Sequence, residues 1–334
     1  MKFTFNFTTL FLKAFFFLGL FLVVSCGKGD DDLLNSEDNS NYFRMVPFEV
    51  ETDPAHREVR ILFQVRDKEF NGVAGMTEED LNVYENDGSI DLEGGLTLNP
   101  GNIPSELKTV LLLDLTRSVE GLVPQIKAAC ITMINNKLPE QTIAIYTFDS
   151  DTHLLQDFTT DAVALKAAIN GMPETGLVNS TNLYGGVIDV SDLWNDVFTI
   201  QAIEDGSLII FTDGRHNATP AITLADANDA LGSKKRYVAA LSSADLDETS
   251  LINLAGREDR YYKAENVAGL ESMFVQIQND IQSLSQSIYY LTYQSPITDP
   301  SPYENTLRVE IDGNRNVGPD KEILESFNSV GFGN

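Results

Sequence analysis

The sequence has 334 residues, of which 43% are hydrophobic and 22% are charged, a composition typical of a folded globular chain. Aspartate and glutamate outnumber lysine and arginine by 50 to 23, which gives a formal net charge of −27 at pH 7. Because such a surface repels phosphate backbones, nucleic acid is excluded as a partner. The excess of carboxylates keeps an exposed protein soluble.

The N-terminal 25 residues predict a secretory signal peptide. Ala14–Val24 is an uninterrupted apolar run preceded by Lys2 and Lys13. This run is too short for a membrane span, which needs about 20 residues, and it fits the apolar core of a signal. Ser25-Cys26-Gly27 follows, and with the preceding valines it resembles the lipobox of bacterial lipoprotein precursors. The resemblance implies that Cys26 is lipidated and anchors the mature chain in a membrane.

Residues 26–41 predict a solvated tether, because this polar tract has too little apolar surface to fold. The acidic cluster Asp30-Asp31-Asp32 close behind Cys26 resembles the surface-export signal of lipoproteins in the Bacteroidetes group. It implies an outer-membrane protein that faces the cell exterior rather than the periplasm. Cys130 is the only other cysteine, so we expect no internal disulfide and a small buried thiol.

Residues 42–106 predict β structure. In Arg57–Arg66 the apolar residues alternate with polar ones, as in a half-buried strand. Leu81–Glu85 predicts a second strand, which ends at the turn signal Asn86-Asp87-Gly88.

Residues 107–285 alternate between strand and helix patterns. Val110–Leu113 is a continuous apolar run, typical of a strand that is buried on both faces. The order of elements predicts an α/β fold, with a doubly wound, mostly parallel sheet and helices on both faces. The predicted strands are Val110–Leu113, Thr142–Phe148, Ser207–Thr212, Arg236–Leu241 and Arg260–Lys263. The predicted helices are Val119–Asn136, Asp161–Asn170, Leu183–Phe198, Ile222–Leu231 and Val267–Leu284.

Residues 286–334 return to β patterns. Ser287–Gln294 is rich in β-prone aromatic residues, and Asn305–Asp312 alternates apolar and polar side chains. Neither terminal region alone buries much surface. We therefore predict that the two regions form one β-sandwich into which the α/β domain is inserted. The alternative is two unrelated caps.

The segment Asp114-Leu115-Thr116-Arg117-Ser118 is the main candidate for a metal-binding site. It lies where a buried strand ends and a helix begins, in the crevice where open α/β sheets bind ligands. One carboxylate and two hydroxyls on one tight turn are hard oxygen ligands, which suit Mg²⁺ or Mn²⁺ better than zinc or copper.

In this segment the sequence resembles the von Willebrand factor type A family. The metal-ion-dependent adhesion site of that family combines Asp-x-Ser-x-Ser after the first strand, a threonine from a later loop and an aspartate after the fourth strand. The matching residues are Asp114, Thr116, Ser118, Thr181 and Asp213. The resemblance covers roughly residues 107–285, and it also extends to bacterial proteins in which such a domain interrupts an immunoglobulin-like sandwich.

The resemblance implies a role for each matching residue. Thr116 and Ser118 contact the metal directly, Thr181 contacts it directly or through water, and Asp114 and Asp213 act mainly through bound water and hydrogen bonds. Thr116 stands where serine is commonest in the family, but it keeps the hydroxyl. The alternative is a degenerate site in which Asp114 and Asp213 remain as helix caps and turn residues.

Other candidate sites are weaker. Asp149-Ser150-Asp151 is a second possible cation site, although a turn between strands explains it as well. The isolated histidines His56, His153 and His216 form no zinc motif. The sequence contains no Gly-x-Ser-x-Gly elbow, P-loop or dinucleotide-binding glycine motif. Asp114 also lacks the second acid, at position 116, that phosphatases with an aspartyl nucleophile need.

These features predict a non-enzymatic lipoprotein of the cell envelope. We expect it to bind, through Mg²⁺ or Mn²⁺, a protein partner that presents an aspartate or glutamate carboxylate. The alternative is a structural scaffold subunit of an envelope complex with a vestigial or stabilising metal site. A hydrolase of envelope polymers would need a general base, and the motif supplies none.

Overall fold

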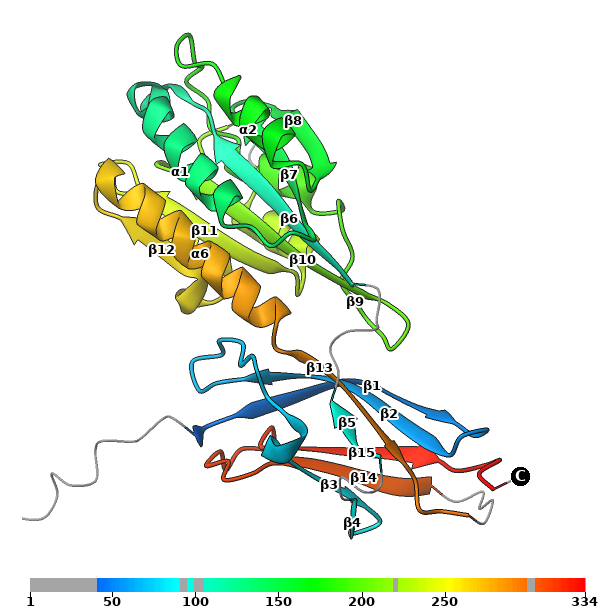
Figure 1. Ribbon diagram of the computed structural model, residues 1–334. Helices are drawn as coiled ribbons and strands as arrows, with labels where there is room; N and C mark the ends of the chain where they lie inside the picture. The colour runs from blue at the N-terminus through cyan, green and yellow to red at the C-terminus, as the bar shows by residue number, and fades with distance from the viewer. Residues whose placement is uncertain (1–40, 91–94, 99–104, 219–221, 299–303, 334) are drawn as a thin grey trace, which may run out of the picture. The chain divides into compact units, whose positions relative to one another are not determined.

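The structure is a computed structural model that describes residues 41–90, 95–98, 105–218, 222–298 and 304–333 (Figure 1). The predicted signal peptide, Cys26 and the predicted tether up to residue 40 lie outside the described residues. Among the helices in the described ranges, none is both long enough and apolar enough to cross a membrane.

The α/β region is built on one seven-stranded sheet. Its strands are β6 (Ser105–Asp114), β7 (Gln141–Phe148), β8 (Thr152–Thr159), β9 (Val197–Phe198), β10 (Ile203–Thr212), β11 (Lys235–Leu241) and β12 (Tyr261–Ala264). They lie in the order β12-β11-β10-β6-β7-β8, and β9 pairs with β10. Only β8 and β9 pair antiparallel with their neighbours, which confirms the predicted mostly parallel sheet.

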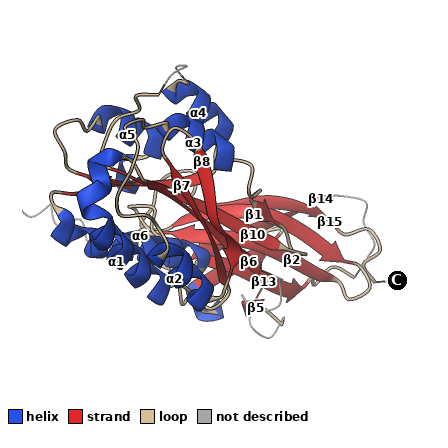
Figure 2. Cartoon of the chain, turned by 90° about the horizontal axis from the view of Figure 1, so that it is seen from above, coloured by secondary structure: helices blue, strands red, loops and turns tan. Residues whose placement is uncertain are grey.

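Helices cover both faces of this sheet (Figure 2). One layer holds α1 (Val123–Asn135), α2 (Ala162–Asn170) and α6 (Leu270–Ser285), and the other holds α3 (Leu183–Val190), α4 (Leu224–Leu231) and α5 (Glu248–Ala255). The central strand β6 serves both layers, because Leu111 and Leu113 face the first while Val110 and Leu112 face the second. This two-sided burial explains the continuous apolar run.

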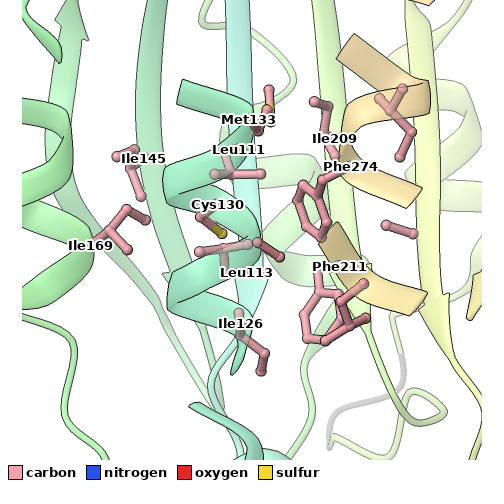
Figure 3. Close-up of a cluster of buried hydrophobic side chains, with 14 of the residues drawn as sticks. Leu111, Leu113, Ile126, Cys130, Met133, Ile145, Ile169, Ile209, Phe211 and Phe274 are labelled. Atoms are coloured by element: carbon pink, nitrogen blue, oxygen red, sulfur yellow. The ribbon is translucent and has the colours of Figure 1, made fainter. Parts of the chain in front are cut away.

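Cys130 lies in the first of these layers. Figure 3 shows it on α1, beside Leu111 and Leu113 of the sheet. The thiol is free and fully buried, as predicted, and burial raises its pKa to about 12. Cys130 is therefore an inert core residue.

The predicted helix Leu183–Phe198 is wrong beyond Val190, where α3 ends. A turn follows, and Val197–Phe198 forms the short strand β9. The pattern misled because Trp194 continues the helical spacing of buried residues, yet it is buried by packing against Gly206 of β10. The start of the predicted helix Val119–Asn136 is also different, since a 3-10 turn spans Arg117–Leu122 before α1 begins.

The two ends of the chain contribute strands to two four-stranded sheets. The first has the order β1 (Arg44–Asp53), β2 (Glu58–Arg66), β13 (Ile288–Gln294) and β5 (Thr97–Leu98). The second has the order β15 (Glu322–Asn328), β14 (Glu304–Ile311), β3 (Leu81–Glu85) and β4 (Gly88–Ile90). Alternate residues of both sheets share one apolar core, which includes Ile61 and Val309, as expected of a β-sandwich. The predicted single sandwich agrees with this arrangement.

We predict that Gly206→Ala destabilises the α/β region by about 1–3 kcal/mol, the usual cost of overpacking a core. A Cβ atom at position 206 would lie 1.8 Å from Cδ1 of Trp194, whose side chain is 2% exposed. Urea unfolding of the two proteins measures the difference. The control is Gly121→Ala, where a Cβ meets no heavy atom within 4 Å. Equal unfolding midpoints for the two variants would contradict the packing argument.

Candidate metal centre

The candidate site begins at the carboxyl end of β6. Asp114 is the last residue of this strand, and the chain beyond it is held by two backbone hydrogen bonds. The amide of Leu115 donates to the carbonyl of Phe148 at 2.9 Å, and the amide of Arg117 donates to the carbonyl of Val178 at 2.8 Å. The 3-10 turn Arg117–Leu122 follows, and Ser118 lies in its first turn.

A chain of hydrogen bonds joins the predicted ligands. The Oδ1 atom of Asp114 accepts from the hydroxyl of Thr116 at 2.7 Å and from its amide at 3.1 Å. The hydroxyls of Thr116 and Ser118 are 3.0 Å apart, and Ser118 donates to Oδ1 of Asp213 at 2.7 Å. The structure therefore brings together four of the five residues that the sequence singled out, from the ends of two neighbouring strands.

Thr181, the fifth residue, is held beside the others by Asn217. Its amide donates to Oδ1 of Asn217 at 2.7 Å, and the amide of Asn217 donates back to the carbonyl of Thr181 at 3.0 Å. The Thr181 hydroxyl has no hydrogen-bond partner within the described part of the chain. It lines the same recess as Thr116, Ser118 and Asp213, so it is free to coordinate a cation.

Burial sets the electrostatics of the two aspartates. Asp114 is 1% exposed, and desolvation raises its pKa to about 6 against the lowering effect of hydrogen bonds from Thr116 and Thr212. Desolvation also raises the pKa of Asp213. The hydrogen bond from Ser118 lowers this pKa, and the charge of Asp245 raises it further. Both carboxylates are thus costly to ionise here, and a divalent cation would offset that cost.

The recess above these residues has a volume of about 450 Å³. Its walls are the side chains and backbone of Thr116, Ser118, Asn179, Thr181, Asp213, Gly214, Arg215, Asn217, Ser243, Ala244 and Asp245. Within the described ranges no cluster of three or more histidine, cysteine, aspartate or glutamate side chains could hold a metal ion. A cation would therefore depend on hydroxyl oxygens as well as carboxylates. This donor set fits a hard divalent ion such as Mg²⁺ or Mn²⁺.

Sequence reasoning missed Thr212. Its hydroxyl donates to Oδ2 of Asp114 at 2.7 Å and is fully buried, so it fixes the orientation of that carboxylate. The register of the sheet explains the contact, because Phe211 pairs with Leu113 in parallel β10 and β6. The sequence shows that Thr212 directly precedes Asp213, but it does not show that Thr212 contacts Asp114.

The other candidates behave as structural features. Asp149, Ser150 and Asp151 form the predicted turn between strands, which joins β7 to β8. The Oδ1 atom of Asp149 accepts from the amide of Asp151 at 3.0 Å and from the hydroxyl of Ser150 at 3.2 Å. His56 and His153 are exposed, whereas His216 is half-buried and stacks on Tyr184.

Residues 109–216 match the family model of the von Willebrand factor type A domain. The chain therefore carries a domain of this family, as its sequence pattern predicted. A search of curated proteins finds no match.

Three of the similar solved structures are as follows. The von Willebrand factor type A protein from Catenulispora acidiphila is 13% identical, with 87% of this chain and 74% of that chain covered and a TM-score of 0.46. The von Willebrand factor domain of the type V pili tip protein from Porphyromonas gingivalis is 13% identical. The match covers 54% of this chain and 96% of that chain, with a TM-score of 0.45. The proximal thread matrix protein from the mussel byssus, with zinc in its adhesion-site motif, is 14% identical. The match covers 60% of this chain and 50% of that chain, with a TM-score of 0.44, so it spans half of that chain.

We predict that Asp114→Asn stabilises the metal-free protein at pH 7. The folded-state pKa of about 6 lies above the ordinary value of 3.8, so the ionised carboxylate destabilises the fold. This destabilisation is absent below about pH 4, develops as the pH rises to about 6 and is then constant. The shift sets an upper limit of about 3 kcal/mol, and the gain falls below it because an amide accepts at only one of its two positions.

Thermal unfolding in EDTA at pH 7 and pH 4 measures this effect. The control is Asp229→Asn, which removes an exposed carboxylate of α4. A variant that is less stable than the parent at pH 7 would show that the hydrogen bonds of Asp114 outweigh its desolvation.

Proposed function

We propose that this protein binds a protein partner through a divalent cation held in the recess at the end of β6 and β10. Thr116, Ser118 and Thr181 would hold the ion through their hydroxyl oxygens, while Asp114 and Asp213 would hold it through water and hydrogen bonds. The observation that carries the proposal is that Thr116, Ser118, Thr181 and Asp213 line one recess, with Asp114 hydrogen-bonded to Thr116 beneath it. The Thr181 hydroxyl has no hydrogen-bond partner among the described residues.

The ligand would be a carboxylate of the partner. A bound Mg²⁺ or Mn²⁺ supplies positive charge beside the carboxylates of the recess, and an external aspartate or glutamate oxygen completes its shell. No histidine, lysine or cysteine is among the described residues that line the recess, and its aspartate Asp213 already accepts a hydrogen bond from Ser118. This composition favours binding over catalysis. Domains of this family commonly bind protein partners, in agreement with the proposal.

A structural scaffold is the second candidate. It is favoured by one observation: the side chains of Asp114, Thr116, Ser118 and Asp213 satisfy one another without a metal. These residues would then serve only to link the ends of β6 and β10 by hydrogen bonds. Metal dependence of partner binding separates the two functions.

We also propose that the protein is a lipoprotein of the outer membrane that faces the cell exterior. The support is the sequence alone: the apolar run Ala14–Val24, the residues around Cys26 and the acidic cluster that follows. A lipid on Cys26 would tether the folded region through the polar segment. The anchored domain would then meet partners on the same or a neighbouring cell surface.

We predict that the parent binds Mg²⁺ and Mn²⁺ saturably in calorimetric titration, and that Asp114→Ala and Asp213→Ala abolish the binding. The control is Asp151→Ala, which removes an exposed carboxylate from the other acidic loop and should leave affinity unchanged. Circular dichroism checks that each variant folds. No binding by the parent would favour the scaffold, and loss of binding in Asp151→Ala would move the site to the turn between β7 and β8.

We predict that Cys26→Ala releases the protein from membranes, because it removes the site of lipidation. Membrane fractions washed with carbonate are compared with the soluble fraction by immunoblot. The matched control is Cys130→Ala, which removes the buried thiol and should leave the protein in the membrane fraction. Retention of Cys26→Ala in washed membranes would contradict the lipid anchor.

A further inference from the structure

Arg215 lies in the wall of the candidate metal recess and has no assigned role. It follows Asp213 and Gly214 in the loop after β10, and its side chain is exposed. The structure gives it no hydrogen bond, ion pair or ring contact among the described residues. It is the only basic side chain among the described residues that line the recess.

The absence of a partner is notable because carboxylates are near. Asp213 and Asp245 line the same recess, yet neither forms an ion pair with Arg215. Asp213 instead accepts the hydrogen bond from Ser118, and its backbone carbonyl accepts one from the hydroxyl of Ser243. The guanidinium therefore remains available to an anion from outside the chain.

Several other basic side chains in this acidic protein form ion pairs within the chain. Lys108 pairs with Glu204 at 2.9 Å, Lys127 pairs with Glu174 at 2.7 Å, and Lys235 pairs with the buried Asp205. The chain has 50 acidic residues against 23 basic ones, and two aspartates line the recess, so acidic partners for Arg215 are not scarce. Arg215 gives the recess a local attraction for anions that the charge of the whole chain lacks.

The recess also has room for more than one acidic group. Its volume of about 450 Å³ falls in the range of ligand pockets, about 300–1,000 Å³. A single carboxylate that completes a metal shell would fill only part of it. A planar guanidinium with several donors can hold a second carboxylate in a bidentate geometry.

We propose that Arg215 is a second anion contact of this recess, so that the site selects a partner segment with two neighbouring acidic side chains. One carboxylate completes the shell of the cation, and the other pairs with the guanidinium of Arg215. The inference rests on the proposed metal-dependent function and names the chemistry of its ligand. Arg215 is thus a specificity-determining residue, outside the five residues that would hold the metal.

Two synthetic peptides test the proposal, acetyl-Gly-Asp-Asp-Gly-amide and acetyl-Gly-Asp-Asn-Gly-amide. Each is fluorescently labelled and titrated with the Mn²⁺-saturated full chain, and fluorescence polarisation reports binding. We expect the parent to bind the diacidic peptide about fivefold more tightly, the size of one favourable exposed ion pair. In Arg215→Gln the preference should fall below about twofold while affinity for the monoacidic peptide is kept.

Arg117→Gln is the matched control. Arg117 lies between Thr116 and Ser118, is exposed, and likewise has no side-chain partner among the described residues, but it does not line the recess. Its loss removes the same charge near the metal and should leave the preference intact. Raising the salt concentration should shrink the preference of the parent and not that of Arg215→Gln.

Three results would overturn the assignment of Arg215. They are equal binding of the two peptides by the parent, no binding of the diacidic peptide, and an equal weakening of both peptides in Arg215→Gln. Manganese saturation is measured separately by calorimetry. Loss of the preference in a metal-loaded protein that still binds the monoacidic peptide therefore rejects this inference alone. Failure to load the metal, or to bind either peptide once loaded, rejects the proposed function.

Discussion

The burial of one carboxylate, that of Asp114, is the constraint on which the candidate site depends. The group is 1% exposed at the end of the central strand, and desolvation raises its pKa to about 6. Hydroxyls of Thr116 and Thr212 compensate by hydrogen bonding to its two oxygens. A fold selected for stability alone would place an apolar side chain here. The proposed cation site would account for a carboxylate kept here at a cost in stability.

The topology of the sheet explains why the site forms at this point. From β6 the chain continues to β7 on one side, and β10 pairs with β6 on the other, so the connections diverge at the carboxyl ends of β6 and β10. Open α/β sheets bind ligands at such switch points. The loop that carries Thr181 precedes α3, and the loop that carries Asp213 follows β10. Residues nearly 100 positions apart thus meet because parallel strands bring their carboxyl ends to one edge.

Both candidate functions use the same geometry and differ in what completes it. The side chains from Asp114 to Asp213 are hydrogen-bonded to one another, which suits a scaffold. The Thr181 hydroxyl and the Arg215 guanidinium line the recess without a partner among the described residues, which suits a binding site. Buried polar groups that are fully hydrogen-bonded are compatible with a stable fold, whereas a largely buried hydroxyl without a partner costs stability until a ligand pairs with it. The unpartnered groups of the recess therefore favour binding.

The sequence by itself determined the class of fold and most of the candidate site. Continuous apolar runs indicated strands buried on both faces, and the spacing of Asp114, Thr116 and Ser118 indicated oxygen ligands at a strand end. Only the tertiary structure decided that α3 ends at Val190, since a helical spacing of apolar residues persists to Trp194 whether or not the backbone stays helical. It also decided the roles of Thr212 and Arg215, because strand register and a shared recess are contacts between distant segments, and no local pattern encodes them.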